Sequence, residues 1–165
     1  MTRPGMTLLE VLVVLAILGV LAGLGLVNYG RWRASTTVMD GAQQLAQTIN
    51  TVRTGVKKAN ACWQLSLVST STSNTQFQVK RYSTPSCPAT GVPVQTRVYD
   101  LPAGTRLVLL DAVGAPTSTD RPVEFVPPYG TTGAAPNTYA VRWASDTGIQ
   151  RKVRVTSVLG KVIVK

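Results

Sequence analysis

The side chains of this chain that could do chemistry are mostly cationic and gather near its C-terminal end. The sequence has 17 Lys and Arg residues against 7 Asp and Glu, a net charge of +10. Within residues 138–165 only Asp146 opposes six basic residues, which are Arg142, Arg151, Lys152, Arg154, Lys161 and Lys165. In a β-strand Lys152 and Arg154 would share one face and Arg151 would lie on the other. An exposed basic face attracts phosphate backbones without reading sequence, so these six residues are candidates for binding DNA.

The acidic residues form no catalytic arrangement. The chain has no histidine, which removes the commonest general base and metal ligand. Apart from Glu10, the acids are scattered over positions 40, 100, 111, 120, 124 and 146. No pair has the spacing of paired catalytic carboxylates, and neither a calcium loop nor a phosphate-binding glycine loop occurs. We therefore predict a protein that is not an enzyme and that uses no cofactor and no metal ion.

Glu10 stands directly before the most apolar segment of the chain. Residues 11–27 carry no charge, and at about 1.5 Å per residue they would form a helix of roughly 25 Å, close to the thickness of a bilayer's hydrocarbon core. An unpaired carboxylate at the margin of a lipid-facing helix costs on the order of 2 to 3 kcal/mol, so Glu10 calls for a partner. The alternative is that Glu10 only caps the first turn, where the helix dipole favours a negative charge. The sequence predicts that the chain enters a membrane near its N-terminus.

The residues around Glu10 resemble a processing signal. A secretory signal peptide is cut after its apolar run, but residues 4–11, PGMTLLEV, resemble the prepilin signature of type IV pilins and type II secretion pseudopilins. In that family a dedicated peptidase cuts after the glycine, methylates the new N-terminus and leaves the apolar helix in place. The resemblance implies cleavage between Gly5 and Met6 and N-methylation of Met6. It also implies an assembly role for Glu10, which would meet the N-terminal amine of a neighbouring subunit.

The same resemblance implies partners and a location. The partners would be other pilin or pseudopilin subunits, the prepilin peptidase and the assembly platform of the inner membrane. The chain would cross the bacterial inner membrane once, with its globular domain outside the cytoplasm, and would be assembled into a surface or periplasmic filament or its tip complex. The signature is shared by pili, type II secretion systems and the DNA-uptake systems of natural competence. Losing Arg3 with the leader leaves +10 − 1 = +9, which favours a minor subunit because many copies of such a charge would repel one another.

The segment departs from the family pattern in two places. Met6 stands where pilins commonly have phenylalanine, and the proline found about twenty residues into many mature pilins is absent. Gly19, Gly23 and Gly25 are the helix-weakening residues instead, and Gly19 and Gly23 also have the spacing of a close-packed helix interface. A single-span membrane protein without an assembly function is the remaining alternative, and it would keep its leader.

Cys62 and Cys87 are the two cysteines of the chain. The resemblance places them outside the cytoplasm, where disulfides persist, so we expect a Cys62–Cys87 disulfide. Closing that loop would contribute roughly 3 kcal/mol on a chain-entropy estimate. The alternative is a pair of unbonded small apolar side chains.

Two periodicities predict the fold. After the apolar run, residues at intervals of three and four form an apolar stripe that predicts one helix continuing to about residue 58; these are Val38, Ala42, Leu45, Ile49, Val52 and Val56. From residue 61 onward, β-branched and aromatic residues predict strands at 62–69, 76–82, 95–101, 106–111, 122–126, 138–144, 151–157 and 161–164. Between the two halves of the helix, aromatic and basic side chains suit the headgroup zone of a membrane; they are Tyr29, Arg31, Trp32 and Arg33.

The predicted fold class is therefore α+β and pilin-like, with a long N-terminal helix packed on a mostly antiparallel β-sheet domain. We expect a leader at 1–5, a transmembrane helix at 6–28, its amphipathic continuation at 29–60 and a β-rich globular domain at 61–165. No second soluble domain is expected, because about 130 residues remain outside the membrane segment.

The C-terminal strands resemble one branch of the pilin family. Residues 139–148, 151–157 and 160–164 look like the terminal strands of GspH/FimT-like minor pilins and pseudopilins. Some FimT-like members are thought to bind DNA during natural transformation through a C-terminal Gly-Arg-x-Arg motif. The matching residues here are 160–163, GKVI, so the second arginine is missing. Two hypotheses for the basic face stay open: DNA binding, and the favoured alternative of a solvated surface or one that meets acidic surfaces of neighbouring subunits.

Overall fold

The computed structural model of the chain describes residues 8–69, 71–88, 91–118, 121–132, 137–156 and 160–165, without the side chains of residues 24–27. Its contacts divide the chain into two units, residues 1–34 and residues 35–165, and each is described by itself. The predicted leader and the Gly5–Met6 cleavage site lie outside the described residues.

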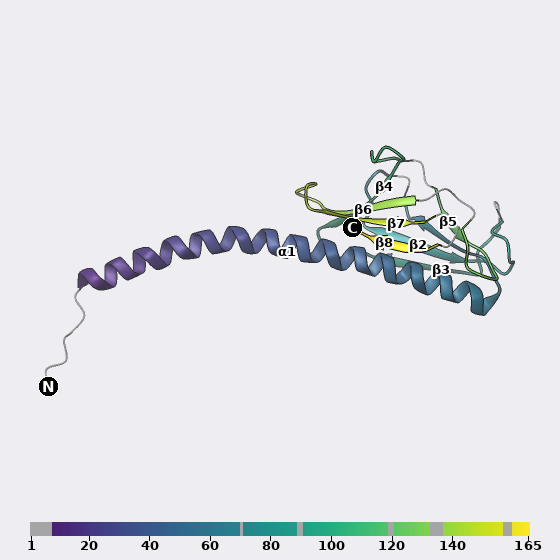
Figure 1. Ribbon diagram of the computed structural model, residues 1–165, viewed down its shortest axis with the longest axis horizontal. Helices are drawn as coiled ribbons and strands as arrows, with labels where there is room; N and C mark the ends of the chain where they lie inside the picture. The colour runs from purple at the N-terminus through teal and green to yellow at the C-terminus, as the bar shows by residue number, and fades with distance from the viewer. Residues whose placement is uncertain (1–7, 70, 89–90, 119–120, 133–136, 157–159) are drawn as a thin grey trace, which may run out of the picture. The chain divides into compact units, whose positions relative to one another are not determined.

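One helix, α1 (Leu8–Ala59), contributes to both units (Figure 1). Glu10 lies in its first turn and Lys57 and Lys58 lie in its last turn, which is the charge distribution that the helix dipole favours. Asn60 follows with a φ of 45°, the left-handed conformation that commonly terminates a helix. The helix therefore ends within a residue of the predicted position.

Eight strands follow α1 in the described part of the chain, and every predicted strand is confirmed with ends that differ by at most two residues. They are β1 (Trp63–Leu67), β2 (Gln76–Arg81), β3 (Gln95–Asp100), β4 (Thr105–Leu110), β5 (Val123–Phe125), β6 (Asn137–Trp143), β7 (Gln150–Val155) and β8 (Val162–Val164). All their pairings are antiparallel.

The strands form two sheets of four. The first sheet has the order β3-β2-β1-β5 and the second sheet has the order β4-β6-β7-β8. The chain changes sheet in the turn between β3 and β4, where the amide of Thr105 donates to the carbonyl of Pro102. Gly104 occupies this turn with a φ of 83°, and a β-carbon there would lie 2.5 Å from the ring of Trp143. Only glycine meets both conditions without strain.

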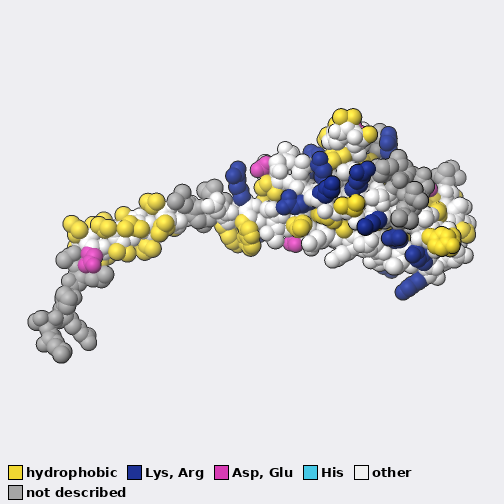
Figure 2. Space-filling view, viewed as in Figure 1, with side chains coloured by type: hydrophobic (Ala, Val, Ile, Leu, Met, Phe, Trp, Pro, Cys, Tyr) yellow, Lys and Arg dark blue, Asp and Glu magenta, His cyan; other side chains and the backbone are white. Residues whose placement is uncertain are grey.

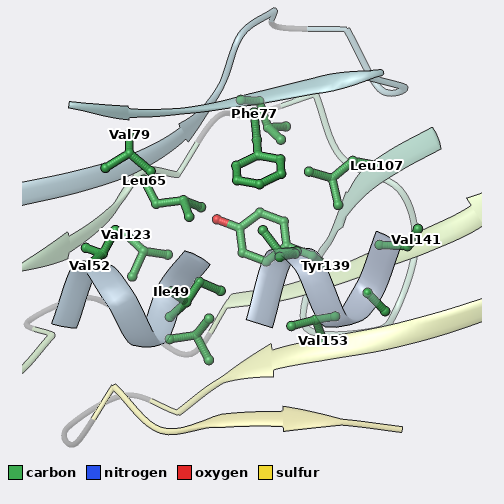
Figure 3. Packing of buried hydrophobic residues seen from close by; sticks show 14 of the residues in the cluster. Ile49, Val52, Leu65, Phe77, Val79, Leu107, Val123, Tyr139, Val141 and Val153 are labelled. Atoms are coloured by element: carbon green, nitrogen blue, oxygen red, sulfur yellow. The ribbon is translucent and has the colours of Figure 1, made fainter. Parts of the chain in front are cut away.

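The helix and both sheets share one core within residues 35–165 (Figure 3). The six residues of the predicted apolar stripe are at most 1% exposed. They pack in one cluster with Leu65 and Phe77 of the first sheet and with Tyr139 and Val153 of the second sheet. Because the stripe runs along residues 38–56 of α1, this part of the helix is an integral layer of the globular unit.

Candidate functional site

The N-terminal unit carries an exposed apolar helix surface. Every described side chain from residue 8 to residue 23 is exposed, and the helix to which they belong, α1, is long and apolar enough to cross a membrane. Figure 2 shows hydrophobic side chains along the described part of this segment. Gly19 and Gly23 have open space where a β-carbon would be. A segment this apolar is stable only in lipid or against other apolar surfaces.

The predicted headgroup residues lie together just beyond the apolar run. Tyr29 and Trp32 are exposed, and their ring centroids are 6.0 Å apart. Arg31 and Arg33 are exposed on the same two turns of α1. Amphipathic aromatic rings beside arginines are the side-chain types enriched at a membrane–water interface.

The second sheet brings five of the six predicted basic residues to one face. Opposed residues of antiparallel strands lie on the same face of a sheet, and Val141 and Val153 define the inner face because they belong to the core. The alternate positions form the outer face and include Arg142, Lys152, Arg154, Lys161 and Lys165. Arg151 is the exception, because it pairs with Val141 on the inner side, where it is only partly exposed. Figure 2 shows Lys and Arg spread over the viewed side of the globular unit.

A groove follows this outer face over β6, β7 and β8. It consists of two adjoining hollows of ≈ 460 Å³ and ≈ 330 Å³, which share Thr138, Lys152 and Arg154 as lining residues. Arg121 lines the larger hollow and Lys165 lines the smaller one. We call this feature the basic groove. Its basic side chains suit a polyanion more than a small apolar ligand.

Among the described residues that line the basic groove, Asp111 is the one with a carboxylate side chain. Asp111 lines the larger hollow, and its Oδ1 accepts hydrogen bonds from the amides of Val113 at 3.0 Å and Ala115 at 2.7 Å. The Asp111 side chain therefore stabilises the turn formed by residues 111–115. The cations Arg121, Lys152, Arg154 and Lys165 outnumber it along the groove.

Two basic residues on or beside the outer face were missed by the sequence-based prediction. Arg106 lies directly opposite Arg142 in the β4–β6 pairing, and Arg121 lines the groove beside Arg154. Neither belongs to the C-terminal cluster of basic residues, and the sequence does not reveal which strands pair. The alternation of Arg106 with Leu107 predicts an outward side chain but not its neighbours.

The residues that match the Gly-Arg-x-Arg position have distinct roles. Gly160 is buried with a φ of 58°, and a β-carbon there would lie 3.0 Å from the ring of Phe125 and 3.1 Å from the carbonyl oxygen of Gly130. This glycine is thus required by the fold. Lys161 is exposed, and Ile163 occupies the place of the second arginine while lining the smaller hollow of the basic groove.

The disulfide prediction is confirmed. Cys62 and Cys87 are bonded, with their Cα atoms 5.3 Å apart, inside the usual range for a disulfide. Cys62 is fully buried directly after the end of α1, whereas Cys87 lies in the segment between β2 and β3. The bond ties that segment to the core.

The described residues hold no group of three or more His, Cys, Asp and Glu side chains that could bind a metal ion. Two of the described carboxylates, Asp111 and Asp146, act instead as local hydrogen-bond acceptors. Asp146, for example, accepts from the amide of Gly148 at 2.9 Å.

Comparisons with known proteins find similarity at two levels. Residues 1–26 match the family model described as the prokaryotic N-terminal methylation motif. The fold is similar to two crystal structures of the type IV minor pilin FimU from Pseudomonas aeruginosa strain PAO1. One match has a TM-score of 0.54 at 11% identity and covers 78% of this chain and 87% of the crystallised chain. The other match has a TM-score of 0.51 at 11% identity and covers 77% of this chain and 91% of the chain in that crystal structure. No curated protein matches the sequence.

Proposed function

We propose that this chain, which combines the N-terminal methylation motif and the fold of type IV pilins, is a minor pilin or pseudopilin. The observation that carries the proposal is the continuity of α1. The same helix presents an uncovered apolar surface at residues 8–23 and then contributes the apolar stripe of the globular core. One end of the helix is thereby committed to the fold, while the other is free to join lipid or other helices.

Processing would precede assembly. The prepilin peptidase would cut between Gly5 and Met6 and methylate the new amine of Met6, which leaves the apolar helix at the mature N-terminus. The chain would then wait in the bacterial inner membrane as a single-pass protein with residues 35–165 outside the cytoplasm. The aromatic pair of Tyr29 and Trp32 fits the headgroup zone of that arrangement.

Glu10 would select the register of assembly. Its carboxylate is exposed in the first turn of α1, and placing such a charge in apolar surroundings costs on the order of 2 to 3 kcal/mol unless a cation meets it. The amine of Met6 in a neighbouring subunit would supply that cation. The apolar side chains around it would exchange lipid contacts for contacts with other pilin helices, with the assembly platform delivering the subunit.

The proposal is tested by comparing three forms of the full chain in a pilus-forming host. Glu10→Ala removes the assembly carboxylate, and Asp40→Ala removes an exposed carboxylate from the same helix outside the apolar run. We expect the wild type and Asp40→Ala in the sheared filament fraction, and Glu10→Ala retained in the membrane with its disulfide intact. Equal incorporation of Glu10→Ala would overturn the assembly role.

A second candidate function is DNA binding during uptake, and the basic groove favours it. The groove joins four basic side chains on one face without depending on the missing second arginine. Lys152→Gln with Arg154→Gln removes two charges from the groove, and Arg97→Gln with Lys57→Gln removes two exposed charges elsewhere. DNA binding that weakens with salt and falls only in the first variant would support this function. Absence of binding at low salt would leave the structural role alone.

A further inference from the structure

A third hollow on the outer face of the second sheet is built differently from the basic groove. It has a volume of ≈ 240 Å³ and shares none of the lining residues of the groove. Two of its lining side chains are Arg106 of β4 and Arg142 of β6. These arginines are direct cross-strand partners, so their side chains leave neighbouring strands on the same face.

The two arginines place like charges side by side. Like charges directly opposite each other on neighbouring strands destabilise a sheet. Among the residues that the structure describes, neither guanidinium forms an ion pair, and the Nε of Arg142 is buried without a hydrogen-bond partner. A buried donor left unsatisfied costs about 1 to 3 kcal/mol. A bound anion would offset the like-charge contact between the two guanidinium groups.

The other lining residues of the hollow are three that carry hydroxyl groups and four that are apolar, which are Val108, Pro116, Trp143 and Ala144; no carboxylate is among the described lining residues. Thr72 and Ser73 reach it from the segment between β1 and β2, and Thr147 reaches it from the turn between β6 and β7. Asp146 is the nearest acid in that turn, and its Oδ1 is engaged by the amide of Gly148. The lining therefore combines two arginines and three hydroxyl-bearing residues with an apolar wall, and the polar groups are what an anion would contact.

We propose that this hollow binds a tetrahedral oxyanion, a phosphate or sulfate group that carries two negative charges. Guanidinium groups bind such groups through paired hydrogen bonds. A phosphate monoester has a charge of about −1.5 to −2 at neutral pH, which matches two arginines better than the single charge of a phosphodiester does. The site is independent of the pilin assembly described above. Its ligand could be a free anion or an ester on a larger molecule, since both present the same chemistry.

The test uses the full chain in detergent micelles. Sodium phosphate, sodium sulfate and dimethyl phosphate are titrated at constant ionic strength, balanced with chloride, while the amide signals of residues 105–108 and 142–147 are followed by NMR. We expect saturable shifts with phosphate and sulfate and weaker binding of dimethyl phosphate. Equal affinity for dimethyl phosphate would overturn the preference for a dianion and assign the site to phosphodiesters.

Variants distinguish phosphate binding in this hollow from non-specific attraction of phosphate to a basic protein. Arg106→Gln and Arg142→Gln should each weaken phosphate binding by about tenfold or more, because each removes charged hydrogen bonds. Arg97→Gln removes an exposed charge from the first sheet and should change nothing. Arg142→Lys keeps the charge but loses the planar fork, and we expect an intermediate affinity.

Unfolding measurements test whether a variant loses phosphate binding only because it is less stable. Removing Arg106 relieves the like-charge contact, so the Arg106→Gln variant should be at least as stable as the wild type without phosphate. Phosphate should raise the Tm of the wild type but not of this variant. Shifts that are linear in phosphate concentration, or equal in all variants, would overturn the proposal.

Discussion

Ile163 of β8 lies directly opposite Arg154 of β7, and both side chains line the smaller hollow of the basic groove. Ile163 is 37% exposed, so a longer side chain there would reach solvent without entering the core. The place where a Gly-Arg-x-Arg motif would have its second arginine is therefore part of the basic groove. A basic side chain at position 163 would therefore add one more cation to the groove without disturbing the core.

Ile163→Arg should strengthen binding of double-stranded DNA by the chain. One further phosphate contact is expected to steepen the slope of log K against log salt by about 1. The measurement is a salt series of binding constants. Val98→Arg is the matched control, because it adds the same charge to a half-exposed valine of the first sheet. An equal gain in both variants would show that net charge, and not the groove, governs binding.

Gly104→Ala should destabilise the globular unit more than Gly114→Ala. Both glycines have a positive φ, 83° and 92°, but a β-carbon at Gly114 meets nothing within 4 Å. Gly114→Ala therefore carries only the backbone strain, about 1 to 2 kcal/mol. Gly104→Ala must also displace the ring of Trp143, for about 1 to 3 kcal/mol more. Urea unfolding of residues 35–165 measures both, and equal losses would contradict the role given to the Trp143 contact.

Much of this fold could be predicted from local sequence patterns. The apolar stripe from Val38 to Val56 predicted a helix with one buried face. Runs rich in β-branched and aromatic residues predicted all eight β segments, because both signals lie within a single element. The division into two sheets could not be predicted. It depends on the turn at Gly104, which takes β4 away from β3, and on the pairing of β4 with β6, which is a contact between distant residues.

The candidate site was predictable to the same extent. Lys152 and Arg154 were grouped correctly because they alternate within one strand, and Arg151 was placed correctly on the opposite face. Arg106 was missed because only the register of the second sheet brings it beside Arg142. Arg121 was missed because it lies outside the strands, and a tertiary contact, the hydrogen bond from the side-chain amide of Asn137 to its carbonyl oxygen, places it at the groove. Local periodicity fixes the direction of a side chain, whereas its neighbours across strands depend on tertiary pairing.

Breaking the Cys62–Cys87 bond should lower the free energy of unfolding by about 3 kcal/mol, because the bond restricts a segment of the unfolded chain. The two cysteines are 25 residues apart in the sequence. Cys87→Ser is the cleaner variant, since Cys62 is fully buried and a serine there would also bury a hydroxyl group. Reductant should destabilise the wild type and leave Cys87→Ser unchanged. A wild type indifferent to reductant would contradict the prediction.

Gly19→Leu and Gly23→Leu should impair assembly without affecting the globular unit. Both positions have open space around them in the single chain, so the monomer tolerates larger side chains. A close-packed helix interface does not, because small residues are what let helix backbones approach. Gly30→Leu is the matched control, since Gly30 is equally unobstructed but lies beyond the apolar run. The filament fraction should fall for the first two variants and stay unchanged for the third.

The mass of the intact protein, extracted from the membranes of a host with an active prepilin peptidase, tests the central claim most directly. We predict the mass of residues 6–165 with one disulfide and one added methyl group, and fragmentation that places the methyl group on the amine of Met6. Gly5→Ala should abolish this product and give the uncut chain. A wild-type protein that keeps residues 1–5 would contradict the pilin function and leave a single-span membrane protein.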